Sequence, residues 1–249
     1  MLNYPSSLHI RCRLRYEADL RYQSLLFELS TRKEINMQSQ ISIICSGGQL
    51  GEWAIPYINQ EHYLIGADRG AQFLIENGFT PNIAIGDFDS VTKEQYDIIQ
   101  LKSKEILSFD AIDKDYTDTE LSFLHAIERG STEIILLGGL GTRFDHSIGN
   151  IQLLSLALHK GIKACLIDAH NQIRLIHDSL NVQRDQYHYI SLLPYSEVVT
   201  GITLEGFKYP LHNATIKKGE SIGVSNELID DDATIHILSG QLLVIQSND

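Results

Sequence analysis

The sequence predicts a mostly parallel, three-layer α/β domain followed by an antiparallel β-sandwich domain. Two observations predict the first domain: short β-rich apolar runs recur between residues 41 and 170, and the segments between them have helical spacing. A third predicts the second domain, because after about residue 172 the helical spacing gives way to short strand-like runs separated by Gly, Pro and Asn. We therefore expect an α/β domain over 37–171 and a β-sandwich over 172–249.

The expected strands of the first domain are five apolar runs: 41–45 (ISIIC), 62–68 (HYLIGAD), 82–87 (NIAIGD), 133–139 (EIILLGG) and 163–168 (KACLID). Two helix starts are marked by capping-box patterns, one at Thr92 with Gln95 and the other at Thr117 with Glu120. A further helix carries one apolar stripe, made of Ile148, Ile151, Leu154 and Leu158. Strands alternating with helices predict a parallel sheet, whose ligands bind outside the carboxyl ends of the strands.

The strand-like runs of the second domain are YHYISLLPY, GITLEGFKYPL, NATIKKGE and ATIHILSGQLLVIQ. Residues 1–36 resemble neither domain, since their arginines are clustered and their apolar residues are irregularly spaced. They are either an added helix or tail, or an untranslated stretch upstream of a start at Met37.

Composition excludes several classes of protein. The chain has 249 residues, 43% of them hydrophobic, which is enough for a real core. Twenty basic against 32 acidic residues give a charge of −12, which disfavours a general nucleic-acid binder. The cysteines Cys12, Cys45 and Cys165 lack disulfide-framework or zinc-site spacing, and no apolar run is long enough for a membrane span. We expect a cytoplasmic protein.

Four polar clusters fall at or near expected strand ends: GADRG (66–70), GDFDS (86–90), KDYTD (114–118) and GGLGTRFDH (138–146). Three of them directly follow an apolar strand. Because parallel strands end at a common edge, this arrangement gathers charged side chains along one rim of the sheet: Asp68, Asp87, Asp89, Arg143 and Asp145.

Carboxylates that share a rim repel one another unless a cation lies between them, and oxygen ligands without His or Cys favour Mg²⁺. Because Mg²⁺ commonly binds carboxylates together with substrate phosphates, the rim predicts a metal-bound polyphosphate. Arg143 is suited to clamping phosphate oxygens, with Lys114 and Arg69 as further cations. Each cluster taken singly is also explained as a turn or a helix cap, so the argument rests on four clusters at equivalent chain positions.

The four motifs in this order, followed by GVSNE (223–227), resemble the thiamin pyrophosphokinase family over about residues 41–247. The resemblance implies ATP as co-substrate and a homodimer with sites at the subunit interface. By motif position it implies that Asp87, Asp89 and Asp118 bind Mg²⁺ and that Asp118, Asp89 and Arg143 act in catalysis. It implies that the substrates are bound by Asp68, Lys114, Thr117, Arg143, Asp145, Ser225 and Asn226, the last two in the thiamine pocket.

The implied reaction is attack of the thiamine hydroxyl on the β-phosphorus of ATP, giving thiamine diphosphate and AMP. Two alternatives stay open at this point. One is a metal-dependent nucleotide-sugar transferase with a DxD pair, against which the order of KDYTD and GTRFDH argues. The other is a sensor that binds thiamine or a nucleotide without turnover.

Overall fold

The computed structural model describes residues 40–109 and 116–249. Our interpretation of residues 1–36 and the predicted role of Lys114 lie outside these described residues. Within them, no helix is both long and apolar enough to cross a membrane.

The first half of the chain forms a parallel sheet, as predicted. Its strands run in the order β4-β3-β2-β1-β5-β6, and every neighbouring pair is parallel. Their bounds are β1 (Ile41–Cys45), β2 (Tyr63–Ala67), β3 (Ile83–Gly86), β4 (Ile106–Ser108), β5 (Glu133–Leu137) and β6 (Lys163–Ile167). The sequence analysis missed β4, because three residues are too few to show a strand period.

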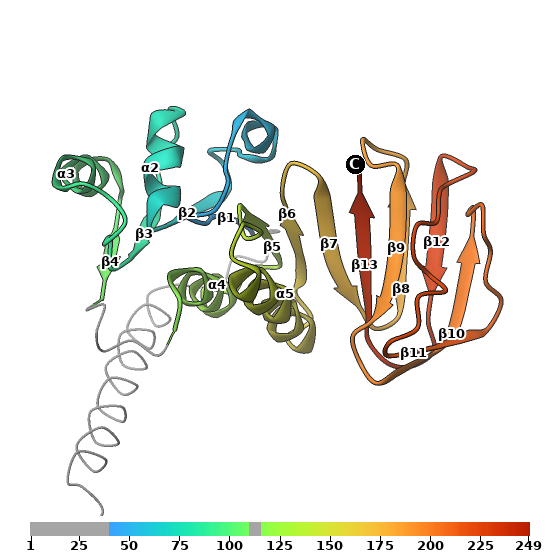
Figure 1. Cartoon of the computed structure of the whole chain (residues 1–249). Helices are drawn as coiled ribbons and strands as arrows, with labels where there is room; N and C mark the ends of the chain where they lie inside the picture. The colour runs from blue at the N-terminus through green and yellow to red at the C-terminus, as the bar shows by residue number, and fades with distance from the viewer. Residues whose placement is uncertain (1–39, 110–115) are drawn as a thin grey trace, which may run out of the picture.

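Helices cover both faces of this sheet (Figure 1). One face carries the 3₁₀ helix η1 (Glu52–Tyr57) with α2 (Arg69–Glu76) and α3 (Lys93–Lys102), and the other carries α4 (Asp118–Glu128) and α5 (Phe144–His159). Successive side chains of β1 point to opposite faces of the sheet and contact different helices. Ile43 packs with Leu74 of α2, whereas Ile44 lies in the cluster that contains Phe123 of α4. The predicted three-layer arrangement is confirmed.

Both predicted helix starts are present. Thr92 and Gln95 form a complete capping box at α3, and the Thr117 hydroxyl accepts the backbone N–H of Glu120 at 3.1 Å. The predicted stripe on α5 is wrong at one position, since Ile148 is 44% exposed. Three residues of an α-helix turn about 60° less than a full turn, and two such steps separate Ile148 from Leu154. The two side chains therefore point in different directions, and only Leu154 is buried.

The second half of the chain is antiparallel, as predicted. Its strands are β7 (Asn171–Ile176), β8 (Ser179–Gln183), β9 (Tyr189–Pro194), β10 (Val198–Glu205), β11 (Ala214–Lys217), β12 (Asp232–His236) and β13 (Leu242–Ser247). β7, β13 and β9 extend the parallel sheet to nine strands, and β11-β10-β12-β8 form a second sheet that packs against this extension (Figure 1). The expected domain boundary at 171/172 falls at the start of β7, so one sheet continues across it.

Gly70, in the first turn of α2, lets this helix pack directly on the end of β1. A Cβ atom at Gly70 would lie 1.8 Å from the carbonyl oxygen of Cys45, which neither backbone can accommodate without moving. By contrast, nothing lies within 4 Å of a Cβ atom at Gly149, in the middle of α5.

We expect Gly70→Ala to lower the free energy of unfolding by about 3 kcal/mol, because the added methyl overpacks a helix–strand contact. Gly149→Ala is the matched control and should raise that free energy by about 0.5–1 kcal/mol through better helix propensity. Urea unfolding followed by circular dichroism measures both values. Equal effects of the two substitutions would contradict the close contact at Gly70.

Candidate functional site

Three acidic segments converge at the carboxyl end of the parallel sheet. Asp68 directly follows β2, Asp87 directly follows β3, and Asp118 is the first residue of α4. Gly86 lies between them: a Cβ atom there would be 3.3 Å from Oδ1 of Asp118 and 3.4 Å from Cα of Asp68. The structure therefore brings Asp68 and Asp118 to Gly86 at this edge, and a residue without a side chain makes the close approach possible.

Asp68 has an unusual backbone and an incompletely paired carboxylate. Its φ of 51° and ψ of −118° are sparsely populated by residues other than glycine, a conformation that costs about 1–3 kcal/mol and is concentrated at functional sites. The side chain does not cap α2; instead, Oδ2 accepts a hydrogen bond from the hydroxyl of Ser90. Oδ1 is buried and has no hydrogen-bond partner among the described residues. A buried carboxylate oxygen in this state is suited to binding a cation.

The loop after β3 is anchored by Phe88. This residue also has a positive φ, 57°, and its buried ring packs against Tyr96 of α3 with 5.1 Å between ring centroids. Asp87 and Asp89 flank the anchor, and Oδ1 of Asp87 accepts the backbone N–H of Asp89 at 3.2 Å. Asp87 thus also supports the turn, which was the alternative explanation of the DxD pattern. The sequence analysis missed Phe88, although an aromatic residue between two aspartates was a visible signal.

The described residues of the rim do not form a complete metal site by themselves. Among the residues that the structure describes, no group of three or more His, Cys, Asp or Glu side chains is arranged to hold a metal ion. Mg²⁺ usually binds one or two protein carboxylates and fills its remaining positions with water and substrate phosphates. The donors present, with the unpartnered oxygen of Asp68 among them, therefore fit a metal shared with a polyphosphate.

The start of α4 is tied to the end of β1. The hydroxyls of Ser46 and Thr119 are 2.7 Å apart and buried, which fixes the first turn of the helix beside the Gly47–Gly48 turn. Burial raises the pKa of the Glu120 carboxyl, and a hydrogen bond from the Thr117 backbone opposes that rise. The glycine-rich turn after β1 was another missed part of the rim, and its place directly after the first strand was the signal.

Arg143 and Asp145 lie together at the start of α5. The guanidinium donates from Nε and Nη2 to the two carboxylate oxygens at 3.3 and 2.7 Å, and both side chains are exposed. This pairing raises the pKa of Arg143 and lowers the pKa of Asp145. A guanidinium carries five N–H donors, so its other N–H groups remain able to contact a phosphate.

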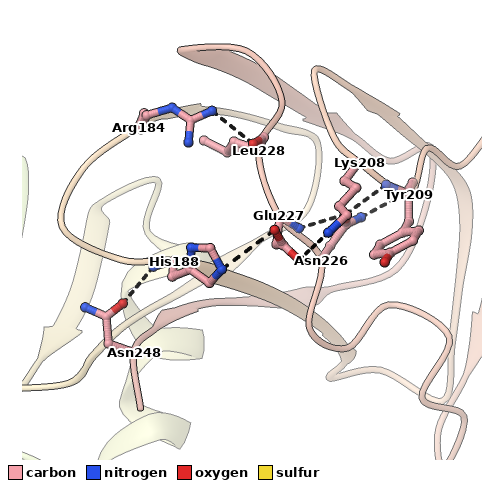
Figure 2. Close-up of polar contacts among 8 residues, drawn as sticks. All are labelled: Arg184, His188, Lys208, Tyr209, Asn226, Glu227, Leu228 and Asn248. Carbon is pink, nitrogen blue, oxygen red and sulfur yellow. Dashed lines mark hydrogen bonds and ion pairs between the residues drawn. The ribbon is translucent and has the colours of Figure 1, made fainter.

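Asn226 of the GVSNE segment lies in the second half of the chain, where its side chain hydrogen-bonds two backbone segments together (Figure 2). We call this set of hydrogen bonds the Asn226 bracket. Its amide donates to the carbonyl of Tyr209 at 2.8 Å and accepts the backbone N–H groups of Tyr209 and Glu227 at 3.0 and 2.9 Å. The residue is only 4% exposed. Most of its hydrogen-bonding capacity is therefore used to join the segment at 208–209 to the one at 226–227.

The neighbours of Asn226 are more accessible. Ser225 is exposed, has a φ of 58°, and donates its backbone N–H to the hydroxyl of Ser191 at 3.0 Å. Glu227 pairs with Lys208 at 2.8 Å and approaches His188 at 3.6 Å (Figure 2). The Lys208 ammonium lowers the pKa of the Glu227 carboxyl. The segment therefore carries an accessible Ser225 and the paired carboxylate of Glu227, and the hydrogen bonds of Asn226 fix its backbone.

The acidic rim and the GVSNE segment are far apart in one chain. Asn226 pairs with Ile190 on β9, whereas Asp68 follows β2. From β2 the sheet crosses β1, β5, β6, β7 and β13 before it reaches β9, which is six strand spacings of about 4.8 Å, or roughly 29 Å. The structure brings the aspartates of the rim together but does not bring Ser225 and Asn226 to them.

Known proteins resemble both halves of the chain. Residues 55–166 match the family described as "Thiamin pyrophosphokinase, catalytic domain", and residues 177–242 match "Thiamin pyrophosphokinase, vitamin B1 binding domain". A thiamine pyrophosphokinase of Bacillus subtilis is 37% identical over 195 residues, which are 78% of this chain and 91% of that protein.

Solved structures agree with these matches. A crystal structure of thiamine pyrophosphokinase from Bacillus subtilis superposes with a TM-score of 0.78 at 35% identity and covers 84% of this chain and 99% of its own. A thiamin pyrophosphokinase family protein from Enterococcus faecalis gives 0.75 at 30% identity and covers 85% and 100% of the two chains.

The hydrogen bonds of the Asn226 side chain predict that the protein is less stable when that side chain is removed. Asn226→Ala should lower the free energy of unfolding by about 2 kcal/mol, because it leaves backbone groups of Tyr209 and Glu227 without partners. Asn59→Ala is the control, since Asn59 is exposed and makes only a local bond to the backbone of Glu61. A chemical denaturation midpoint for Asn226→Ala equal to that of the control would show that the bracket carries no stability.

Proposed function

Since this chain belongs to the thiamin pyrophosphokinase family, we propose that its acidic rim binds Mg²⁺ together with the polyphosphate of ATP. The activity itself is that of a thiamine diphosphokinase, which transfers the diphosphate of ATP to the hydroxyl of thiamine. The observation that supports the rim as the reaction centre is the close approach of Asp68 and Asp118 at Gly86. There Asp68 keeps a buried carboxylate oxygen that has no hydrogen-bond partner among the described residues. Asp87, Asp89 and Asp118 are the proposed metal ligands, and the buried oxygen of Asp68 is proposed as a further donor beside them.

Bound at the rim, Mg²⁺ would supply positive charge to the phosphate oxygens. The chain's own residues then position the reactants. Asp118 orients the attacking hydroxyl of thiamine and accepts its proton, a limited role because carboxylates are weak bases. Arg143 offsets charge on the transferring group through the N–H groups that Asp145 does not use. AMP leaves opposite the attacking oxygen.

The nucleotide side of the site comprises Asp68, Thr117, Arg143 and Asp145 in this proposal, together with Lys114 outside the described residues. The N-terminus of α4, which Thr117 caps, adds backbone N–H groups that favour an anion. Acidic groups at the same rim also suit thiamine, whose thiazolium ring is positively charged. The rim can therefore attract both substrates once a metal neutralises part of its charge.

The thiamine side is assigned to Ser225 and to the segment that Asn226 holds. A separation of roughly 29 Å from the rim is too long for one thiamine molecule to bridge within one chain. We therefore propose a homodimer in which the GVSNE segment of one subunit faces the rim of the other. The exposed Phe144 and Ile148 at the start of α5 offer apolar surface for such an interface. We also propose a cytoplasmic location, consistent with Cys45 and Cys165 being free and buried.

The reaction is tested by its products. Incubation with thiamine, ATP and Mg²⁺ should yield AMP and thiamine diphosphate in equal amounts, because the bond to the β-phosphorus is the one exchanged. Removal of Mg²⁺ with EDTA should abolish the reaction, and added Mg²⁺ should restore it. Chromatography of the nucleotides measures the ratio. Formation of ADP would indicate transfer of a single phosphoryl group, and substrate binding without AMP would indicate a sensor.

Asp89 is tested by charge removal. Asp89→Asn should lower kcat at least 100-fold at limiting Mg²⁺ while leaving the unfolding midpoint within the range of an ordinary surface substitution. Asp97→Asn provides the control, since Asp97 is exposed on α3 and loses the same charge outside the rim. Near-normal activity of Asp89→Asn at limiting Mg²⁺ would remove Asp89 from the metal ligands.

A further inference from the structure

An arginine of β7 faces the interior of the β-sandwich. Arg174 lies opposite Val244 of β13, and the next residues on the same face of the sheet, Ile176 and Leu242, belong to the sandwich core. A charged group on a face that packs against another sheet is expected to have a partner of opposite charge. Within residues 40–109 and 116–249, however, Arg174 forms no ion pair.

A chain of hydrogen bonds holds the Arg174 guanidinium in place instead. Nη1 of Arg174 donates to Oε1 of Gln246 at 2.6 Å, and Nε2 of Gln246 donates to Oδ2 of Asp185 at 2.9 Å. Gln246 is buried, so its amide is fixed between the two charged groups and keeps them apart. The remaining N–H groups of Arg174 have no hydrogen-bond partner among the described residues. The guanidinium is therefore fixed in position and still able to bind an anion.

Arg174 lines a cleft of about 500 Å³ at the end of the β-sandwich, a volume typical of sites for small molecules. Val182 of β8 and Ala233 of β12 also line this cleft, and both belong to the sandwich core. None of the lining residues belongs to the acidic rim or to the GVSNE segment. The cleft is therefore distinct from the proposed reaction centre.

A second arginine lines the same cleft. Arg184 directly follows β8 and is held through Nε by Asp231 and through Nη2 by the carbonyl of Leu228, the latter contact being drawn in Figure 2. Its Nη1 has no hydrogen-bond partner in the described part of the chain. A phosphate carries nearly two negative charges and three acceptor oxygens, enough for two guanidinium groups, whereas one guanidinium satisfies both oxygens of a carboxylate.

We propose that this cleft is a second ligand site, which binds the phosphate group of a small phosphorylated molecule through Arg174 and Arg184. The bound phosphate supplies the counter-charge that Arg174 lacks within the described chain, and the guanidinium presents parallel N–H groups to its oxygens. Both products of the reaction, AMP and thiamine diphosphate, carry such a group. The site would hold one of them away from the rim.

Arg174→Gln tests the site by removing its inner cation. Calorimetric titration with inorganic pyrophosphate is carried out in EDTA, so that no metal draws the anion to the acidic rim. The unsubstituted protein should bind saturably, and Arg174→Gln should bind at least about tenfold more weakly, the usual effect of losing hydrogen bonds to a charged group. Lys217→Gln is the control, because Lys217 is exposed on β11, outside the cleft, and its substitution removes the same charge.

A charge swap keeps the test decisive if Arg174→Gln disturbs the fold. The double substitution Asp185→Asn with Gln246→Glu leaves the net charge unchanged and retains the hydrogen bonds of the chain, but it places a carboxylate directly on Arg174. This internal counter-charge should also weaken pyrophosphate binding by about tenfold. The proposal is overturned if the swap and Lys217→Gln have the same affinity, or if the unsubstituted protein does not bind pyrophosphate in EDTA.

The chemistry and the source of the ligand are separated by three further titrations in EDTA. Malonate, a dicarboxylate of similar size, should bind at least about tenfold more weakly than pyrophosphate, and equal affinity would overturn the assignment to phosphate. AMP and thiamine diphosphate are each titrated into the unsubstituted protein and into Arg174→Gln. The product whose affinity falls in the variant is the ligand of the cleft, and unchanged affinities for both would overturn the binding of a product there.

Discussion

The crowding of carboxylates around Gly86 is the constraint on which the site depends. Parallel strands must end at one edge, so the residues that follow β2 and β3 are neighbours whatever their charge. At that edge the chain adopts a positive φ at Asp68 and at Phe88, anchors the loop with the ring of Phe88, and uses a glycine where Asp118 approaches. These features are costly for folding alone, and the proposed binding of a cation and a polyphosphate at the rim would account for them.

Continuity of the sheet is the second determinant. The parallel half and the antiparallel half both contribute strands to one nine-stranded sheet. Their relative position is therefore fixed by backbone hydrogen bonds between β6, β7 and β13 and not by a linker. This rigid arrangement also keeps the GVSNE segment far from the aspartates of the same chain. If the reaction uses both segments, one subunit cannot supply them to the same site, and this distance across the sheet is the physical argument for the proposed homodimer.

Local patterns in the sequence determined five of the six strands of the parallel sheet, the capping boxes, the order of the four acidic motifs and the likeness to a family. Each of these is set by neighbours along the chain. They could not reveal β4, the exposure of Ile148 or the bracket formed by Asn226, since a three-residue strand has no period and burial depends on what packs opposite. Only the tertiary structure placed Ser90 against Asp68 and left the other oxygen of that carboxylate without a partner within 40–109 and 116–249. It alone decided that the acidic rim and the GVSNE segment lie at distant strands of one sheet, because pairing between strands distant in sequence is a property of the whole fold.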